Sequence, residues 1–378
     1  MDHSHRLTRR TVLRALGGGA GGAAIGSVAG CLDTPRERID IRETARGGSS
    51  GILENPDGPP PVLADQRLHV GHPLVAMESA AVSGGPGVDG IPSIDEPDFQ
   101  AASEAELDNA DPVFGVVRNG VAKAYPQSIL VWHEIVNDAF DGEPVAVTYC
   151  PLTGTAQGFE RGETTFGVSG LLVNSNLIMY DRGTGTRWPQ IAATGIEGPL
   201  ADRSLAEFPV VWSTWGSWRA VHPDTQVLTT DTGYQRRYGS DPYGGYNPPS
   251  DYYADDSLLF EPLASSDAAE PKTVVIGART PDGAIAFNKE TLLAGGVMTG
   301  KAGGVGFIAV ADPALETGYV YRNDEGATVG AAAGGEPGRY TVDGQLAAAA
   351  ELPLDRLVAA DAMFFAWYGF YPGMTYVD

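Results

Sequence analysis

The side chains of this chain best suited to chemistry are a cysteine and a pair of histidines. Cys150 closes an apolar run and precedes a proline, so its backbone is expected to be extended at the end of a strand. His133 and His222 offer imidazole nitrogens, and Met179 offers a thioether. Because a thiolate beside one or two imidazoles suits soft metals, these four side chains are candidate ligands of a copper-type transition metal.

The same thiol supports a second hypothesis, in which it is a nucleophile. Cys150 would attack, His133 or His222 would act as the base, and Glu134 or Asp224 would orient the imidazole. Thiol-dependent hydrolysis or acyl transfer would follow. Both hypotheses compete with the ordinary roles of a buried cysteine as a small hydrophobe and of a buried histidine as a satisfied core residue. No serine nucleophile elbow, phosphate-cradling loop or dinucleotide fingerprint occurs.

A third hypothesis is a non-catalytic surface binding or structural protein. Tyrosines gather between glycine, asparagine and proline residues in the segment 231–253, at Tyr234, Tyr238, Tyr243, Tyr246, Tyr252 and Tyr253. Aromatic loops of this kind hold sugars or peptides in other proteins, and they also pack over cores. Packing over the core is the expectation here.

The elements that position these side chains are short and rich in β-forming residues. Asn119-Gly120 between two apolar runs predicts a hairpin, and a helix is expected from Pro126 to about Phe140. His133 would lie on the apolar face of that helix. Strands are predicted at residues 144–149 and 155–160. The tryptophans Trp212, Trp215 and Trp218 step by three, which predicts a helix with a core-facing stripe.

Residues 272–323 repeat the plan of residues 110–162, with matching hairpin, helix start and strands. This pattern predicts an internal duplication of a hairpin–helix–strand unit. The second copy has no counterpart of His133 or Cys150, so any chemistry is expected in the first. The expected fold class is α+β, predominantly antiparallel β with short helices, in a single domain over residues 63–378.

The start of the chain reads as an export signal. Arg9 and Arg10 form a twin-arginine motif, and residues 15–29 are too short and glycine-rich to span a membrane. Val28-Ala29-Gly30-Cys31 is similar to a lipobox. We therefore expect residues 1–30 to be a signal peptide and the folded protein to be exported by the twin-arginine pathway. A lipid on Cys31 would then anchor it to the outer face of the cytoplasmic membrane.

Residues 31–62 are expected to form a flexible tether, since they hold few large apolar side chains. The chain has two cysteines, so lipidation of Cys31 leaves Cys150 without a partner and excludes a disulfide framework. Acidic residues number 48 against 25 basic ones, giving a net charge of −23. This acidic composition resembles that of surface proteins of halophilic archaea. The excess of negative charge argues against nucleic acid as a partner.

Several longer motifs together resemble the DUF3179 family of exported proteins of unknown function. They are Tyr125-Pro126, Trp132–Asp138, Pro144–Leu152, Ser175–Arg182, Trp215, His222–Thr225 and Phe364–Pro372. The resemblance brings no established activity. Members of the family often read Cys-Pro-Leu-Cys where this chain has Cys150-Pro151-Leu152-Thr153, so the second thiol is absent. This chain therefore cannot use residue 153 as the second thiol of an internal disulfide or of a two-sulfur metal site.

Overall fold

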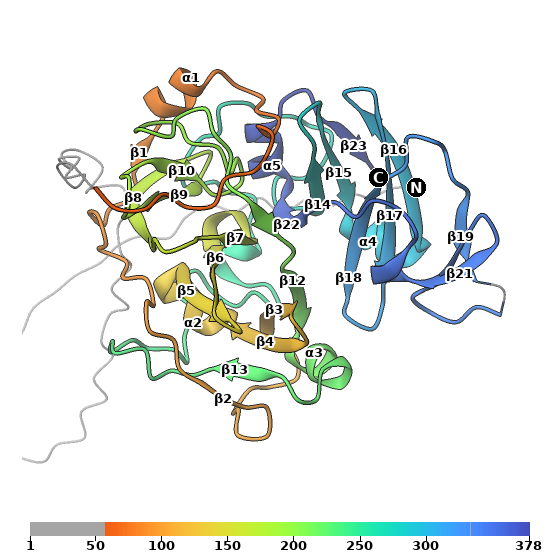
Figure 1. The fold of residues 1–378 in the computed structure, drawn as a ribbon, viewed down its shortest axis with the longest axis horizontal. Helices are drawn as coiled ribbons and strands as arrows, with labels where there is room; N and C mark the ends of the chain where they lie inside the picture. Colours follow the sequence, from red (N-terminus) through yellow and green to blue (C-terminus); the bar gives the residue numbers. More distant parts are fainter. Residues whose placement is uncertain (1–56, 333) are drawn as a thin grey trace, which may run out of the picture. The chain divides into compact units, whose positions relative to one another are not determined.

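The computed structural model describes residues 57–332 and 334–378 (Figure 1). The twin-arginine motif, Cys31 and the tether up to residue 56 lie outside the described residues. Export by the twin-arginine pathway and the lipid anchor therefore stay predictions. None of the helices found in the described ranges has the length and apolar character that crossing a membrane would need.

The described residues form mainly antiparallel sheets joined by short helices, which confirms the predicted α+β class. The N-terminal elements are α1 (Leu74–Ser79), β1 (Val82–Ser83), β2 (Phe99–Ala101), β3 (Pro112–Arg118), β4 (Val121–Pro126), α2 (Gln127–His133), β5 (Ile135–Phe140), β6 (Glu143–Cys150), η1 (Pro151–Thr153), β7 (Thr155–Glu160), β8 (Phe166–Val173), β9 (Asn176–Asp181), β10 (Arg187–Pro189), β11 (Glu207–Phe208), β12 (Val211–Thr214), α3 (Trp215–Val221) and β13 (Gln226–Leu228).

The C-terminal elements follow after a long connection. They are η2 (Asp251–Tyr253), β14 (Val274–Arg279), β15 (Ala284–Asn288), α4 (Lys289–Gly295), β16 (Val297–Ala302), β17 (Val305–Asp312), β18 (Thr317–Arg322), β19 (Val329–Ala331), β20 (Arg339–Val342), β21 (Gln345–Ala348), η3 (Ala349–Glu351), β22 (Ala359–Met363), α5 (Phe364–Phe370) and β23 (Thr375–Val377).

The first hairpin forms as the sequence predicted. Strands β3 and β4 pair from Val113↔Pro126 to Arg118↔Val121. Asn119 and Gly120 make the turn with φ values of 51° and 77°. Positive φ at both central residues gives the backbone twist that matches the flanking strands, and asparagine and glycine adopt it at low cost.

The helix expected to reach Phe140 is shorter than predicted. It ends at His133, Glu134 takes a left-handed conformation with φ 58°, and Ile135 opens β5. Strand β5 pairs with β6 from Ile135↔Thr148 to Phe140↔Glu143. The spacing of apolar residues in this segment is compatible with a helix and also with a strand that is buried on both faces. Pairing with β6 stabilises the strand. The tryptophan stripe was also wrong in part, because Trp212 lies in β12 and α3 begins only at Trp215.

Two parts of the chain share one order of elements. Strands β3–β4, helix α2 and strands β5–β7 are followed later by β14–β15, α4 and β16–β18. Each hairpin carries a further strand pair: β12 lies antiparallel to β3 and β13 parallel to β4, while β22 lies antiparallel to β14 and β23 parallel to β15. Figure 1 shows β12, α3 and β13 beside β3 and β4.

A glycine in each hairpin accommodates a tryptophan from a helix later in the chain, α3 for the first hairpin and α5 for the second. A Cβ atom on Gly115 would lie 2.1 Å from Trp218, and one on Gly277 would lie 2.4 Å from Trp367. Both indoles are fully buried. Because any side chain at these positions would overlap a ring, the close packing of helix on hairpin depends on glycine.

Candidate thiol site at Cys150

Cys150 is the last residue of β6, as predicted, and stands where the strand enters the turn η1. Its side chain is 1% exposed and belongs to the largest apolar cluster of the described residues. The sulfur accepts a hydrogen bond from the Leu177 amide at 3.3 Å, and the thiol donates to the Ser175 carbonyl at 3.6 Å. The β8–β9 turn therefore holds the thiol in one orientation.

The thiol is protonated at neutral pH. Burial raises the pKa of Cys150 to about 11, the charge of Glu134 adds to the rise, and hydrogen bonds from Thr153 and Leu177 oppose it. The thiolate is the nucleophilic form of cysteine. Any chemistry at Cys150 thus needs a neighbouring group that accepts its proton.

Glu134 is placed to be that group. Its left-handed backbone ends α2, and its carbonyl accepts a hydrogen bond from the amide of Tyr149, the residue before Cys150, at 2.7 Å. The side chain is 6% exposed, and its carboxyl group makes no hydrogen bond or ion pair with any described residue. Burial raises the pKa of Glu134 to about 8. A buried acid whose pKa is raised by burial is typical of a functional site.

Two tyrosines from a distant part of the chain cover the thiol. Tyr252 is buried and its hydroxyl donates to the carbonyl of Leu152 at 2.7 Å. Tyr243 packs against the same apolar cluster as Cys150, with its ring centroid 6.1 Å from that of Tyr252. The Tyr243 hydroxyl has no hydrogen-bond partner among the described residues. Burial raises the pKa of Tyr243, and the charges of Glu134 and Cys150 raise it further.

The covering stretch, residues 241–263, is named here the tyrosine segment. Its only helical turn is η2, and no strand pairs with it. Side chains anchor it instead: Gln127 donates to Asp241 at 2.7 Å, Ser175 donates to the Phe260 carbonyl at 2.9 Å, and Asn174 accepts from the Leu263 amide at 2.7 Å. Packing over the core, the expectation from sequence, describes this segment, whereas Tyr234 outside it is 45% exposed.

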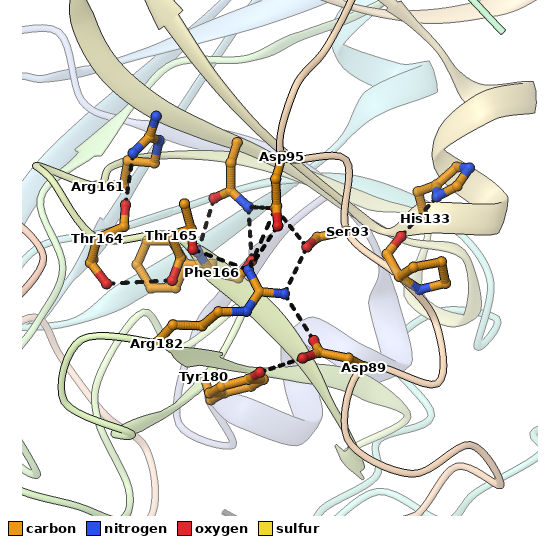
Figure 2. Close-up of polar contacts among 12 residues, drawn as sticks. Asp89, Ser93, Asp95, His133, Arg161, Thr164, Thr165, Phe166, Tyr180 and Arg182 are labelled. Carbon is orange, nitrogen blue, oxygen red and sulfur yellow. Dashed lines mark hydrogen bonds and ion pairs between the residues drawn. The ribbon is translucent and has the colours of Figure 1, made fainter. Parts of the chain in front are cut away.

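His133 has both ring nitrogens occupied. Nδ1 lies 2.7 Å from the Pro92 carbonyl and Nε2 lies 2.7 Å from the Tyr238 hydroxyl, and Figure 2 shows the ring turned toward that carbonyl. Burial lowers the pKa of His133. Neither nitrogen contacts Cys150. The imidazole therefore connects the segments that contain Pro92 and Tyr238 to α2.

Of the other candidates from the sequence, His222 packs elsewhere, whereas Met179 shares the apolar cluster of Cys150. The ring of His222 packs against that of Trp218 at a tilt of 44°, with ring centroids 4.2 Å apart, and Asp224 is exposed. Met179 is buried in β9, within the same apolar cluster as Cys150. Across the described part of the chain, no three histidine, cysteine, aspartate or glutamate side chains are grouped to hold a metal ion. The copper-type site therefore stays a prediction, and no cluster of such ligands among the described residues supports it.

A network around Arg182 was missed by the sequence reasoning. Its guanidinium donates to Asp89, Asp95, Ser93, Thr165 and the Phe166 carbonyl (Figure 2). These bonds fasten the 89–95 stretch to the neighbourhood of β8 and β9, and Ile94 within that stretch forms a parallel bridge with Val136 of β5. In the sequence, only the Asp181-Arg182 pair at the end of the Ser175–Arg182 motif pointed to this network. The pair does not indicate which distant residues Arg182 contacts.

Comparison with protein families matches residues 88–374 to a family described as a protein of unknown function, DUF3179. The chain belongs to the DUF3179 family. Neither the curated proteins nor the solved structures give a match to it. The matched range includes Glu134, Cys150 and the whole tyrosine segment, so the thiol site lies inside the DUF3179 domain.

The departure from the frequent DUF3179 pattern lies in this site. Thr153 occupies the position of the second cysteine, is fully buried, and accepts a hydrogen bond from Asn176 at 3.1 Å. Its hydroxyl and its amide both lower the pKa of Cys150. In this DUF3179 protein, Thr153 therefore supports the Cys150 thiolate with hydrogen bonds rather than with a second sulfur.

Proposed function

We propose that this DUF3179 protein is an extracytoplasmic lipoprotein with thiol-dependent acyl-transfer or hydrolase activity at Cys150. The observation that carries the activity is the burial of Glu134, with a raised pKa, at the end of the hairpin whose other end carries Cys150, the only free cysteine of the described residues. The twin-arginine motif at Arg9 and Arg10, and the lipobox cysteine Cys31, support the address.

The first step transfers the Cys150 proton to the Glu134 carboxylate while sulfur attacks the acyl carbon. The bond between that carbon and its leaving group breaks, and the leaving group takes the proton from Glu134. The result is a thioester on Cys150 and a released alcohol, amine or thiol. Water or another acceptor then attacks the thioester and restores the thiol. A base whose pKa is about 8 combines sufficient ionisation with sufficient basicity near neutral pH.

Glu134 thereby takes the role that the sequence hypothesis assigned to a histidine. His133 is held by Pro92 and Tyr238, which leaves it no free nitrogen for the thiol. The backbone of Glu134 is held at the end of β6 by the hydrogen bond from the Tyr149 amide. A metal site at Cys150 is the less supported alternative, since its four proposed ligands do not gather.

The test uses the lipoprotein purified at high salt from its own membrane, with Cys150→Ser and Glu134→Gln as variants. Incubation with 4-nitrophenyl acetate is expected to release a burst of 4-nitrophenolate and to leave an acetyl group on the Cys150 peptide, measured by mass spectrometry. The Ser variant should show no burst. In Glu134→Gln the dependence of acylation on pH should lose its inflection near pH 8. Absence of acetyl-Cys150 in the wild-type protein would overturn the proposed activity.

The same preparation tests the metal alternative and the address. A near-stoichiometric transition metal that Cys150→Ser removes would replace the acyl-transfer proposal with a metalloprotein. Replacing Arg9 and Arg10 with lysine should block export, and Cys31→Ser should release the protein from the membrane. Retention of the Ser variant on the membrane would contradict the lipid anchor.

We also propose that the two parts with the same element order arose by duplication. Their matched strand pairings and the Gly115–Trp218 and Gly277–Trp367 contacts support this proposal. Superposition of residues 110–162 on residues 272–323 in an experimental structure tests it, and a mismatch in strand register would contradict it.

A further inference from the structure

We propose that the tyrosine segment, residues 241–263, is a gate that moves away from Cys150 as a unit while the sheets stay folded, and that this opening controls access to the thiol. The inference rests on the proposed thiol activity and adds the way in which that site is regulated. It is carried by the hydrogen bonds that attach the segment to the rest of the described chain, each of which involves a side chain.

The segment is bonded to both pieces of chain that lie next to the thiol. Tyr252 donates its hydroxyl hydrogen to the carbonyl oxygen of Leu152 at 2.7 Å, in the turn η1 that follows Cys150. On the other side, the Cys150 thiol donates to the Ser175 carbonyl at 3.6 Å, and the Ser175 hydroxyl donates to the Phe260 carbonyl at 2.9 Å. The thiol side chain is 1% exposed in this closed form, so a reagent reaches the sulfur only after some part of the structure moves.

The attachment of the segment differs from that of the other elements around Cys150. Within residues 57–332 and 334–378, no hydrogen bond between two backbone groups joins residues 241–263 to another element. By contrast, Cys150 itself pairs with Thr155 in the β6–β7 ladder, and the β8–β9 turn closes a ladder that begins at Val173↔Asn176. Local opening affects the most weakly attached parts of a protein first, whereas strands of a core sheet open together. The segment is therefore the part that can leave the thiol at the lowest cost in free energy.

Contacts within the segment make it a compact unit. The Tyr252 amide donates to the Tyr243 carbonyl at 3.0 Å. The rings of Tyr246 and Tyr253 pack edge to face with their centroids 4.9 Å apart. Because a surface loop that packs on itself keeps these contacts when it is displaced, the segment can move as one body.

Apolar contacts keep the gate closed most of the time. Leu258, Leu259 and Phe260 pack against the cluster that contains Cys150, and Tyr252 is buried. Opening exposes this surface to water, which costs free energy in proportion to its apolar area. The open form is therefore a minor one, and an acyl compound that binds only the open form would raise its share. The rate of any reaction at Cys150 thus includes the fraction of molecules in which the segment is open.

The test measures alkylation of Cys150 by iodoacetamide in the full lipoprotein at molar salt, by mass spectrometry of the Cys150 peptide. Tyr252→Phe and Ser175→Ala each delete one bond of the gate. Both leave the hydrogen bonds of the sulfur, because those use the backbone of Ser175 and Leu177. Each variant should be alkylated about two- to tenfold faster than wild type, the factor that one net hydrogen bond contributes to an equilibrium constant. Tyr234→Phe, at an exposed tyrosine outside the segment, should leave the rate unchanged.

A further variant, Val320→Ala, separates opening of the gate from unfolding of the whole domain. Val320 is fully buried in another apolar cluster, which holds no residue of the tyrosine segment. The smaller side chain should lower the unfolding midpoint in urea but leave the alkylation rate, measured well below that midpoint, within about twofold of wild type. The inference is overturned if the Val320→Ala rate rises by the same factor as its unfolding equilibrium constant, or if Tyr252→Phe and Ser175→Ala are alkylated at the wild-type rate.

The same samples distinguish failure of the gate from failure of the proposed activity. Faster alkylation of the two gate variants, with no acetyl-Cys150 in wild type after 4-nitrophenyl acetate, would keep the gate and remove the acyl-transfer proposal. Acetyl-Cys150 in wild type, with alkylation unchanged in both gate variants, would remove the gate and keep the activity.

Discussion

The amide nitrogen of Tyr149 lies 2.7 Å from the carbonyl oxygen of Glu134. This bond extends the β5–β6 ladder one residue past Ile135↔Thr148, into the left-handed end of α2. It sets Glu134 beside the end of β6, where the next residue after Tyr149 is Cys150. This hydrogen bond joins the backbones at the two ends of the β5–β6 hairpin, so Glu134 and Cys150 lie at the same end of that strand pair.

The first prediction concerns the stability of the protein against pH. Burial raises the pKa of Glu134 from 4.5 to about 8 in the folded state, so the folded protein binds the proton more tightly than the unfolded chain. The stabilisation is fully present below pH 4.5 and is lost as pH rises through 8. Glu134→Gln should remove this loss, about 5 kcal/mol for the whole rise in pKa. Denaturant unfolding at molar salt between pH 5 and pH 9 measures it.

The matched control for that experiment is Glu78→Gln, at a carboxylate on the exposed side of α1. The two unfolding curves, wild type and this control, should change with pH in parallel. Should Glu134→Gln also run parallel to wild type, the carboxyl group of Glu134 is not enclosed as described.

The second prediction concerns Thr153→Cys. A hydrogen bond from the Thr153 side chain lowers the pKa of the Cys150 thiol; Cys150 directly precedes the turn η1, and Thr153 is the last residue of that turn. A thiol at position 153 should therefore form a disulfide with Cys150 on mild oxidation, with no change in the chain elsewhere. Thiol titration should fall to zero after oxidation, and the disulfide should appear in the peptide map. Ser257→Cys, at an exposed position, should keep both thiols free.

The third prediction concerns Gly115→Ala. The added Cβ would lie 2.1 Å from the Trp218 ring, which cannot retreat because it is fully buried and its Nε1 donates to Thr225 at 3.0 Å. Overpacking of this kind should lower the free energy of unfolding by about 1–3 kcal/mol or more. Gly330→Ala adds the same methyl group to a strand where nothing lies within 4 Å. Its unfolding midpoint should stay close to that of wild type.

The fourth prediction concerns Arg182→Lys. A lysine keeps the charge but loses the planar fork that reaches Asp89, Ser93 and the Phe166 carbonyl together. The free energy of unfolding should fall by about 1–3 kcal/mol. The loss should persist at molar salt, since the partners include neutral oxygens that salt does not screen. Arg237→Lys, at an exposed arginine, should have no such effect.

Local signals in the sequence predicted the parts of the fold that depend on neighbouring residues. The Asn119-Gly120 turn selected the first hairpin, because few residues adopt its backbone angles. The apolar run before Cys150 selected β6. The helix through Phe140 failed because its spacing suits two structures, and only pairing with β6 distinguishes them. The candidate list already held Cys150 and Glu134, but it paired the thiol with histidines that the fold commits elsewhere.

By itself the sequence determined the class of the domain, its DUF3179 membership and the end-of-strand position of Cys150, because turn residues, long motifs and apolar runs are local properties. The tertiary structure alone decided which side chains share the thiol's surroundings. The β5–β6 strand pair brings the backbone of Glu134 to the end of β6, and the tyrosine segment packs Tyr243 against the apolar cluster that contains Cys150. Such contacts join residues distant in the chain, and their geometry follows from how the whole core packs.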